Sequence, residues 1–501
     1  MFSTSSDTRK PLPGQARPVR RNSRYKKTLA AFLAGSILLS ALLVLTAFVL
    51  DPLQVYRKAE WYSPVFSTEQ RYQNPGLAKN YDYDTIIIGT SMTENFLPSK
   101  VDAAIGGKSM KLSIRGSTAG EHYEIAKLAL DTGKVKTVIW GLDYFSLKSG
   151  VRDDQGPFPF YLYDNNFLND YKYWFNESTY EQLFKGLARQ VRTGKAQDLE
   201  TLYNWHAASA FSEFLVVKHY REARNEEAYF SLNEDPLEDI QASFDNYILS
   251  LVKAYPDVEF KFYYPPYSIL RQVVWKETNP ERYENQLTMK KWMHDRFSQH
   301  NNAEVYDFQT EAVWTFDLDL YKDMSHHSQD VNTWIAEAIG RRDPHYLVTA
   351  DNVDVTNEML QQQVEQAVVD SENRLHRYEV VVRAGEGDQE QAAAFSKREI
   401  ASEGELMVPV KEAIDVLGAS LDWDQATKTL TLKRGEDKLS MAVASDKGLL
   451  NGEEIAIPNP AKLERGTTYV PLAFVAEALG WDAAYTPMTE RLHKLVLSPS
   501  E

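Results

Sequence analysis

The longest uninterrupted apolar segment of the chain lies near its N-terminus. Thr28–Leu50 is a run of 23 residues without a charge, which as a helix rising 1.5 Å per residue would be about 34 Å long. That length is enough to cross a bilayer. A secretory signal peptide has a shorter apolar core that ends at a small-residue cleavage site, which segment 48–52 (FVLDP) does not offer. The pattern therefore favours a transmembrane signal anchor over a cleaved signal.

Beyond this segment, to about residue 345, short apolar runs alternate with stretches of helical periodicity. The runs are rich in β-branched or aromatic residues and predict buried strands at Asp84–Gly89, Lys108–Ile114, Val135–Gly141 and Val258–Tyr264. Gly120–Asp131 has apolar residues at helical spacing and predicts a helix. Residues 150–245 indicate a more helical, aromatic-rich insertion. Such alternation predicts an α/β fold, a doubly wound parallel sheet with helices on both faces.

The pattern changes after residue 345. Residues 346–400 are predicted to link two domains. Within them, Asn357–Val369 has helical spacing, Gly385–Gln391 is polar and loop-like, and Tyr378–Arg383 is a candidate first strand of the second domain.

Residues 401–501 contain an internal repeat and predict a small α+β domain. Val408–Gly418 recurs as Val470–Gly480, and each copy is followed by a tryptophan, Trp423 or Trp481, and then by an apolar strand. Each unit is predicted to be a helix, a turn and a strand, because a glycine ends a helix at little conformational cost. The two tryptophans are predicted to be core residues rather than sugar-stacking platforms, since aromatic burial dominates small cores.

Charge is distributed unevenly along the chain. Residues 1–27 hold eight basic residues against one aspartate, a charge of +7, which leaves −23 for the other 474 residues. The net negative charge of the residues after 27 argues against a nucleic-acid partner, because nucleic acids are themselves negatively charged. By the positive-inside rule, the basic tail 1–27 is cytoplasmic, 28–50 is the single membrane anchor, and the rest is extracellular. The chain has no cysteine, which excludes disulfides, thiolate metal sites and cysteine nucleophiles.

Three chemically distinctive residues, Ser91, Gly116 and Asp143, each follow a predicted strand. Loops at the carboxyl ends of parallel strands meet at one edge of an open α/β sheet, where such sheets hold their sites. A serine alcohol needs a histidine to take its proton and a carboxylate to orient that histidine. Asp323 and His326, near the end of the same predicted domain, supply both groups.

These segments resemble the motif blocks of the SGNH (GDSL-like) hydrolase superfamily, in particular its membrane-anchored branch that moves acyl groups on bacterial surface polymers. The resemblance covers about residues 80–345 of a domain predicted at 51–345, and it implies an SGNH-type sheet. It implies that Ser91 is the nucleophile and that Asp323 and His326 complete the triad. It further implies that the backbone N–H groups of Ser91 and Gly116 help to form an oxyanion hole.

One block departs from the family pattern. The family usually carries Gly-x-Asn-Asp, whose asparagine amide donates to the oxyanion, whereas this chain has aspartate at Asp143 in the sequence GLDY. An ionised carboxylate there would repel the developing negative charge. Three alternatives stay open: Asp143 is protonated, it orients another group, or it plays no part.

Several residues near the motifs have more than one interpretation. His327 lies beside His326, but the Asp-x-x-His spacing favours His326 as the base. No carboxylate–histidine set with metal-ligand spacing accompanies them, so no metal or other cofactor is predicted. Glu94 and Asn95 fit a helix start and Tyr267 fits a rigid loop after two prolines, and each is also a candidate for substrate contact.

The predicted function is that of a serine-dependent esterase or O-acyltransferase acting on acyl esters, chiefly acetyl, of a cell-surface polysaccharide. His326, oriented by Asp323, would deprotonate Ser91, and the resulting acyl-enzyme would pass its acyl group to water or to a sugar hydroxyl. The resemblance implies a multispan membrane acyltransferase as partner when the acyl group must be delivered across the membrane. The alternative is a catalytically degenerate protein of this fold that binds glycan or scaffolds a cell-envelope complex.

The C-terminal repeat resembles the copper amine oxidase N-terminal-like domain, a module appended to surface proteins of Gram-positive bacteria, where it looks like a stalk. The resemblance does not imply copper. After residue 400 the chain has a single histidine, His493, and copper sites need several nitrogen ligands. A binding or spacing role is predicted for this domain, not catalysis.

Overall fold

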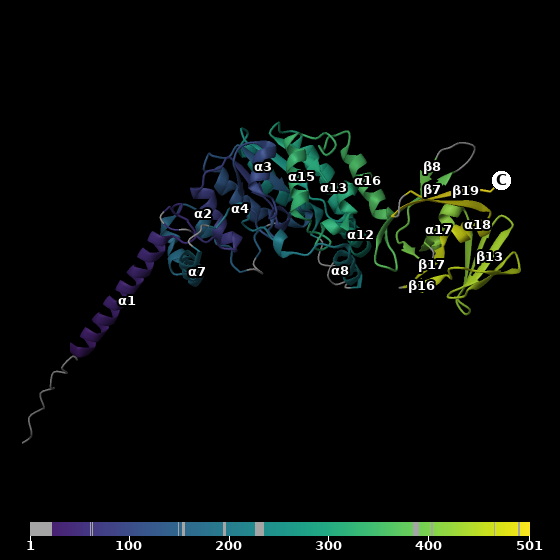
Figure 1. The fold of residues 1–501 in the computed structure, drawn as a ribbon, viewed down its shortest axis with the longest axis horizontal. Helices are drawn as coiled ribbons and strands as arrows, with labels where there is room; N and C mark the ends of the chain where they lie inside the picture. Colours follow the sequence, from purple (N-terminus) through teal and green to yellow (C-terminus); the bar gives the residue numbers. More distant parts are fainter. Residues whose placement is uncertain are drawn as a thin grey trace, which may run out of the picture.

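The computed structural model describes residues 23–500 apart from 61, 63, 149, 153–155, 194–196, 226–234, 384–389, 402–403, 465 and 489–490. Most of the predicted basic tail and of the predicted loop Gly385–Gln391 lies outside the described residues. Figure 1 shows an elongated molecule. Helix α1 (Ser23–Leu50) projects from one end, an α/β part occupies the middle, and a β-rich part forms the other end.

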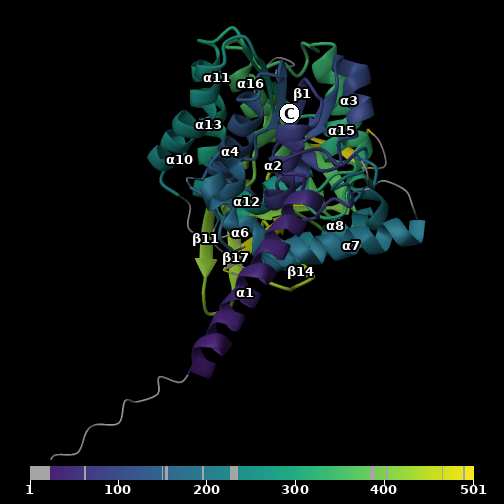
Figure 2. The same ribbon diagram turned by 90° about the vertical axis from the view of Figure 1, so that its left-hand side faces the viewer.

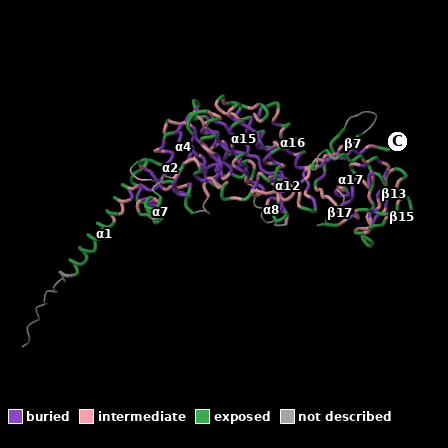
Figure 3. The backbone as a smooth tube through the Cα atoms, viewed as in Figure 1, coloured by how far each residue is buried: buried purple, intermediate pink, exposed green. Residues whose placement is uncertain are grey.

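Helix α1 contains the apolar segment. It is long and apolar enough over Tyr25–Leu50 to cross a membrane, and Figure 3 shows most of it exposed. A signal sequence near the N-terminus satisfies the same criterion. All of the predicted segment Thr28–Leu50 lies within this helix.

Five parallel strands form the central sheet, in the order β2-β1-β3-β4-β5. Their bounds are β1 Thr85–Ile88, β2 Ser109–Lys111, β3 Thr137–Gly141, β4 Glu259–Tyr264 and β5 Ala303–Asp307. The prediction of an α/β fold with a parallel sheet is confirmed. Strand β2 is shorter than the predicted run Lys108–Ile114, because it is an edge strand whose one partner, β1, ends at Ile88.

Both faces of the sheet are covered by helices. Successive strand residues point to opposite faces, so Ile87 and Ile139 join one apolar cluster, whereas Ile86 and Val138 join another. The covering helices are α3 Pro98–Ile105 and α15 Gln329–Gly340 on the first face, and α2 Gln70–Asn80, α4 Ala119–Leu130 and α13 Pro280–Phe297 on the second. Helix α4 lies within one residue of its predicted bounds and begins with a capping box between Thr118 and Glu121.

The segment between β3 and β4 is helical in its described parts, as predicted for the insertion. It contains η2 Tyr144–Ser146, α5 Phe160–Tyr163, η3 Phe167–Asn169, α6 Tyr171–Trp174, α7 Glu177–Thr193, η4 His206–Ala208, α8 Glu213–Asn225, α10 Leu237–Ser243, the π-helical η5 Phe244–Leu249 and α11 Ser250–Ala254. Helices α6 and α7 pack against α1, whereas α8 packs against α12 (Ile269–Thr278). The insertion therefore joins the apolar helix to the α/β part.

The C-terminal part is mostly β-sheet. Its three sheets have the orders β18-β19-β7-β6, β16-β17-β10-β9 and β11-β12-β13-β14-β15, and β8 pairs with β7. The strands are β6 Ala367–Val369, β7 Leu375–Arg383, β8 Glu390–Ala392, β9 Glu399–Ile400, β10 Leu406–Pro409, β11 Ser420–Asp424, β12 Thr429–Arg434, β13 Asp437–Ala442, β14 Lys447–Leu450, β15 Glu453–Ala456, β16 Lys462–Glu464, β17 Thr467–Pro471, β18 Trp481–Pro487 and β19 Leu492–Pro499. Helices α17 (Val410–Leu417) and α18 (Leu472–Ala478) pack into its apolar core.

Two predictions for this part are wrong in detail. The helix expected at Asn357–Val369 is α16 Val353–Gln366, and its last three predicted residues form β6, which pairs with β7. Each repeat unit has two strands after its helix rather than one, because β11 pairs with β12 and β18 with β19 as antiparallel hairpins. The glycine stop is as expected at Gly418, which follows α17 with a left-handed φ of +63°.

The segment predicted as a linker, 346–400, belongs to both of its neighbours. Helix α16 packs against α12 and α13 of the α/β part, whereas β7 pairs in parallel with β19 of the C-terminal part. The segment is therefore structured on both sides of the junction instead of being a free connector.

The two repeated tryptophans differ in their surroundings. Trp481 is buried, and its indole N–H donates to the Leu417 carbonyl at 3.2 Å. Trp423, in the edge strand β11, is half-buried and lines a groove of about 750 Å³, with its indole N–H donating to Gln425 Oε1 at 2.8 Å. The core prediction holds for Trp481. It holds only in part for Trp423, which packs against the same apolar core but stays half-buried, because β11 has a neighbouring strand on one side only.

Candidate active site

Ser91 lies at the start of the turn that follows β1. Thr90 precedes it as the cap of the 3-10 helix η1 (Ser91–Thr93), and the Ser91 side chain is partly exposed. Gly89 makes the turn possible, because its φ is +150° and a Cβ there would lie 2.6 Å from Thr93 Cγ2. Only glycine fits such a backbone without displacing its neighbour. Strand β1 therefore delivers Ser91 to the carboxyl edge of the sheet.

His326 connects Ser91 to Asp323. Ser91 Oγ lies 2.8 Å from His326 Nε2, and His326 Nδ1 lies 2.8 Å from Asp323 Oδ2. When Nδ1 donates to the carboxylate, Nε2 is left to accept the serine proton. The fold thus brings together three side chains that the sequence singled out, in the order that serine activation requires.

The loop that carries Asp323 also keeps its carboxylate charged. One carboxylate oxygen accepts hydrogen bonds from the backbone N–H groups of Ser325 at 2.8 Å and His326 at 2.9 Å. Burial opposes the charge, but these hydrogen bonds and the His326 ring outweigh it and hold the pKa of Asp323 well below its usual range. Asp323 is therefore an acceptor for His326 at neutral pH.

The neighbouring His327 points into the protein. It is buried, and its Nδ1 lies 3.3 Å from the Ser328 carbonyl oxygen. Burial lowers the pKa of His327 to about 4, so this ring is neutral at physiological pH. The structure gives His326, not His327, the contacts with Ser91 and Asp323. Among the residues that the structure describes, no group of three or more histidine or acidic side chains is placed to hold a metal ion.

Two residues that the sequence did not single out lie against the histidine. The Trp205 ring stands edge-on to His326, with centroids 5.6 Å apart and an interplanar angle of 89°. Lys322 Nζ lies 3.8 Å from the centroid of the Trp205 ring, and burial lowers the pKa of Lys322. No sequence pattern connects Trp205 to His326, because the insertion reaches the site only through the tertiary fold.

Asp143 is a buried acceptor next to the nucleophile turn. It accepts hydrogen bonds from Thr90 Oγ1 at 2.5 Å and from the Tyr267 hydroxyl. Burial raises the pKa of Asp143, although these two hydrogen bonds and His326 act in the opposite direction. Of the three alternatives for Asp143, the contacts favour an orienting role toward Thr90, the residue before Ser91.

The three candidates for substrate contact lie behind the site surface. Glu94, Asn95 and Tyr267 are all buried. Glu94 pairs with Arg115 at 3.1 Å, and Asn95 Oδ1 accepts from the Trp205 N–H at 3.2 Å. The prediction of direct substrate contact does not fit their burial, because apolar and hydrogen-bonded neighbours already cover them. Through these contacts, Glu94 and Asn95 connect the turn after Ser91 to the loops that carry Arg115 and Trp205.

Gly116 lies beside the nucleophile turn, in the loop between β2 and α4. The loop is fixed by a 2.9 Å hydrogen bond from the Ile114 N–H to the Gly89 carbonyl, and Gly116 has a left-handed φ of +60°. Among the described residues, no protein acceptor pairs with the backbone N–H of Ser91 or Gly116. Both groups are candidate oxyanion donors. Asp143, whose two oxygens already accept hydrogen bonds, is not.

A cavity of about 330 Å³ adjoins the histidine. Asp323 and His326 line one side of it, and His219, Glu222 and Arg271 from α8 and α12 line the other. Its size is at the lower end of the range for small-molecule sites. The cavity therefore holds both cationic and acidic groups beside His326, although Ser91 itself does not line it.

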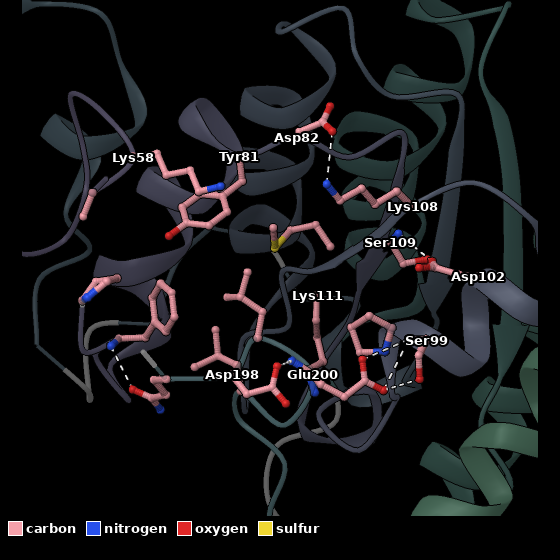
Figure 4. A pocket seen from close by; sticks show the side chains of 18 residues that line it. Lys58, Tyr81, Asp82, Ser99, Asp102, Lys108, Ser109, Lys111, Asp198 and Glu200 are labelled. Atoms are coloured by element: carbon pink, nitrogen blue, oxygen red, sulfur yellow. Dashed lines mark hydrogen bonds and ion pairs between the residues drawn. The ribbon is translucent and has the colours of Figure 1, made fainter. Parts of the chain in front are cut away.

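Figure 4 shows a second cavity, of about 440 Å³, at the β2 edge of the sheet. No member of the Ser91 site lines it. Two of its polar groups are already paired. Glu200 accepts from the Ser99 hydroxyl, and Lys111 Nζ donates to the backbone carbonyls of Glu94 at 2.7 Å and Phe96 at 2.9 Å, which lie outside the cavity lining. Burial lowers the pKa of Lys111 to about 7. Lys111 thus supports the backbone that follows Ser91.

The comparison with known families concerns the other end of the chain. Residues 388–493 match the copper amine oxidase N-terminal domain. This match confirms the resemblance stated for the C-terminal repeat. It includes the first repeat unit and the second unit up to His493, within the last strand β19. Its single histidine, His493, lies 3.0 Å from His376 Nδ1, and His376 in turn contacts Asp370 at 2.9 Å. No curated protein matches the chain.

Proposed function

We propose that the chain is a membrane-anchored, extracytoplasmic serine esterase or O-acyltransferase of SGNH type, acting on acyl esters of a cell-surface polysaccharide. The observation that carries the proposal is the chain of hydrogen bonds from Ser91 Oγ through His326 to Asp323. The resemblance of the motif blocks supports the SGNH assignment, and the apolar helix α1 supports the anchor. A partner multispan acyltransferase is proposed by analogy for the transferase reaction.

The proposed reaction has two half-steps. Ser91 Oγ attacks the ester carbonyl carbon as its proton moves to His326 Nε2, and the backbone N–H groups of Ser91 and Gly116 stabilise the oxyanion. The C–O bond to the leaving alcohol breaks, and that alcohol takes the proton from His326. Water or a sugar hydroxyl then attacks the acyl-enzyme, its proton moves to His326, and Ser91 leaves with that proton.

Mutation of the nucleophile tests this reaction. The full chain, solubilised in detergent, is assayed for hydrolysis of p-nitrophenyl acetate and for labelling by a fluorophosphonate. We expect Ser91→Ala to abolish labelling and to reduce kcat by about 10³-fold or more, as for other serine triads. Ser298→Ala, an exposed serine at the end of α13, is the matched control and should retain both signals.

A non-catalytic role as a glycan-binding or scaffolding protein is the competing proposal. The observation that favours it is Asp143, a buried acceptor at the position where the family carries a donor. If the unaltered chain neither hydrolyses the ester nor reacts with the fluorophosphonate, the enzyme proposal fails and the binding role is favoured. If Ser91→Ala retains full activity, the site assignment fails.

A further inference from the structure

Helix α7 packs one face onto the protein and leaves a second, apolar face exposed. Thr179, Gln182, Leu183 and Gly186 form the face that packs onto the protein. A second stripe, on another side of the helix at spacings of three and four residues, consists of Phe184, Leu187 and Val191 and is exposed. Val191 is 87% exposed. A soluble surface helix normally buries its apolar stripe.

A second group of exposed apolar side chains lies on the segment around α6. It consists of Phe167, Leu168 and Phe175, of which Leu168 is 85% exposed. Single exposed apolar residues are ordinary, but several gathered on one part of a surface mark a contact site. Together with the Phe184, Leu187 and Val191 stripe, this group is here termed the collar.

Both halves of the collar adjoin the end of α1. Helices α6 and α7 pack against α1, and Figure 2 shows them flanking its upper end. On the α7 side, the Tyr180 hydroxyl donates to the Leu43 carbonyl at 2.9 Å. On the α6 side, the Tyr56 ring contacts both Phe48 of α1, at 5.1 Å, and Phe167, at 6.4 Å. The collar is therefore continuous with the surface of the apolar helix.

The junction between α1 and the rest of the protein is fixed. The buried Asp51 carboxylate accepts backbone N–H groups from Val55 at 2.9 Å, Tyr56 at 2.8 Å and Arg57 at 3.1 Å. It also accepts from the Tyr173 hydroxyl in α6 at 3.0 Å. Because α1 is held to α6 by these bonds, insertion of α1 into a bilayer fixes the depth of the collar as well.

That depth places the collar at the outer boundary of the bilayer. The hydrocarbon core is about 30 Å thick and takes about 20 helical residues. Counted from Thr28, directly after Lys26 and Lys27, these residues end near Ala47. Leu43, where α7 contacts α1, then lies about 6 Å inside the boundary, at 1.5 Å per residue. Interfacial amphipathic helices bury their apolar faces about 5–10 Å deep.

The charges and rings around the collar fit a lipid surface. Lys185 and Arg192 of α7 are exposed, as are Glu177 and Glu181. Lys185 pairs with Glu181 at 2.8 Å, so Arg192 is the basic group of α7 placed to meet anionic headgroups. Arg57 donates to the Phe48 carbonyl at 2.7 Å and lies 4.7 Å above the Phe48 ring, at the end of α1. Tyrosine and tryptophan are enriched at membrane–water boundaries because their rings carry both an apolar body and a polar group. Rings of both kinds lie here, since Tyr56 contacts Phe48 at 5.1 Å and Trp174 contacts Phe167 at 5.0 Å.

We propose that the collar is a lipid-contact surface, in which α6 and α7 lie in the headgroup and outer acyl region of the bilayer that α1 crosses. The proposal rests on the membrane anchoring proposed above and is independent of any catalytic role of Ser91. With α1, α6 and α7 all in contact with the bilayer, the protein has one fixed orientation on the membrane instead of rotating freely about a single helix.

The absence of native cysteine makes a direct test possible. Single variants Val191→Cys and Leu168→Cys of the full chain are labelled with an environment-sensitive fluorophore and reconstituted in vesicles of phosphatidylcholine and phosphatidylglycerol. We expect a blue-shifted emission, several-fold stronger quenching by nitroxide-labelled lipid than by aqueous iodide, and no change on dilution of the protein. Leu38→Cys in α1 is the positive control. Val313→Cys, 74% exposed and outside the collar, is the aqueous control.

The outcomes separate the two proposals. If the Leu38 probe is lipid-quenched but both collar probes are as open to iodide as the Val313 probe, the anchor stands and the collar proposal is overturned. If the Leu38 probe is not lipid-quenched, the anchoring proposal itself fails. Collar probes that are shielded from iodide but not quenched by lipid indicate a covering protein, either a second copy or another membrane protein, and also overturn the lipid assignment.

Discussion

At the residue scale, the candidate site depends on side chains that touch no substrate position. Asp143 accepts from Thr90 and Tyr267, and Asn95 accepts from the Trp205 backbone. Sequence patterns identified Ser91, Asp323 and His326, because the spacing of a serine triad is a recognisable motif. They did not identify Trp205, and they left Tyr267 open as either part of a rigid loop or a candidate for substrate contact. Burial depends on the whole fold and cannot be read from a local motif.

Replacement of Asp143 tests its orienting role. In Asp143→Ala the buried hydroxyls of Thr90 and Tyr267 lose their acceptor, which should lower the free energy of unfolding by about 1–3 kcal/mol. Asp143→Asn retains one acceptor oxygen in the same place and should lose less. Urea denaturation of the full chain measures both. Equal stability of the alanine variant and the unaltered chain would argue against these hydrogen bonds.

His327 predicts a specific pH dependence of stability. Burial depresses its pKa to about 4 in the folded state, whereas an unfolded histidine titrates near 6.5. Between these values the unfolded chain binds more protons, so stability is complete above about pH 6.5 and falls as the pH drops toward 4. Replacing His327 by glutamine should flatten this part of the stability curve. A curve of unchanged slope would show that His327 titrates normally.

At the element scale, the strand-to-turn junction at Gly89 decides where Ser91 lies. The apolar run Asp84–Gly89 predicted strand β1 almost to the residue, because a strand covered on both faces has a strong local signature. The hairpins of the repeat units were not predicted, since whether an apolar strand has a partner depends on a turn geometry that composition does not specify. The type of an element could thus be predicted from its own residues, whereas the pairing of strands could not.

Substitution at Gly89 should disturb this junction. Gly89→Ala places a Cβ 2.6 Å from Thr93 Cγ2 at a φ of +150°, which should cost about 1–3 kcal/mol of stability and lower the esterase rate. Gly186→Ala in α7 is the matched control, because a Cβ there meets nothing closer than Val65 Cβ at 4.0 Å. Helical alanine should be neutral or stabilising by about 0.5–1 kcal/mol. Thermal unfolding measures both variants.

At the scale of the whole molecule, rigid junctions connect three parts of different character. Asp51 joins α1 to α6, and α16 with β7 joins the α/β part to the C-terminal part. At the second junction, Glu213 of α8 accepts from the Leu375 N–H at 2.8 Å and from Arg491 at 2.7 Å. The elongated shape in Figure 1 therefore follows from defined contacts.

Loosening the first junction should free α1. Asp51→Ala removes the acceptor of three backbone N–H groups, so the distance between spin labels at positions 38 and 313 should take a broader distribution, measured by pulsed electron resonance on the full chain in vesicles. Asp82→Ala is the control, because the Asp82 side chain is 90% exposed. An equally narrow distribution in Asp51→Ala would mean that α1 is held by its packing against α6 and α7 alone.

The sequence alone determined the long apolar helix, the parallel α/β sheet and the resemblance of the C-terminal repeat to a known domain. It also singled out Ser91, Asp323 and His326 as candidate site residues. All of these leave a local or periodic signature: uninterrupted hydrophobicity, buried β-branched runs, repeated segments and motif spacing. Only the tertiary structure decided that the Trp205 ring lies against His326, that Asp143 is an acceptor toward Thr90, and that the exposed apolar stripe of α7 lies beside α1. These features are contacts between segments far apart in the chain, and their energies depend on burial and geometry that arise only when the chain has folded.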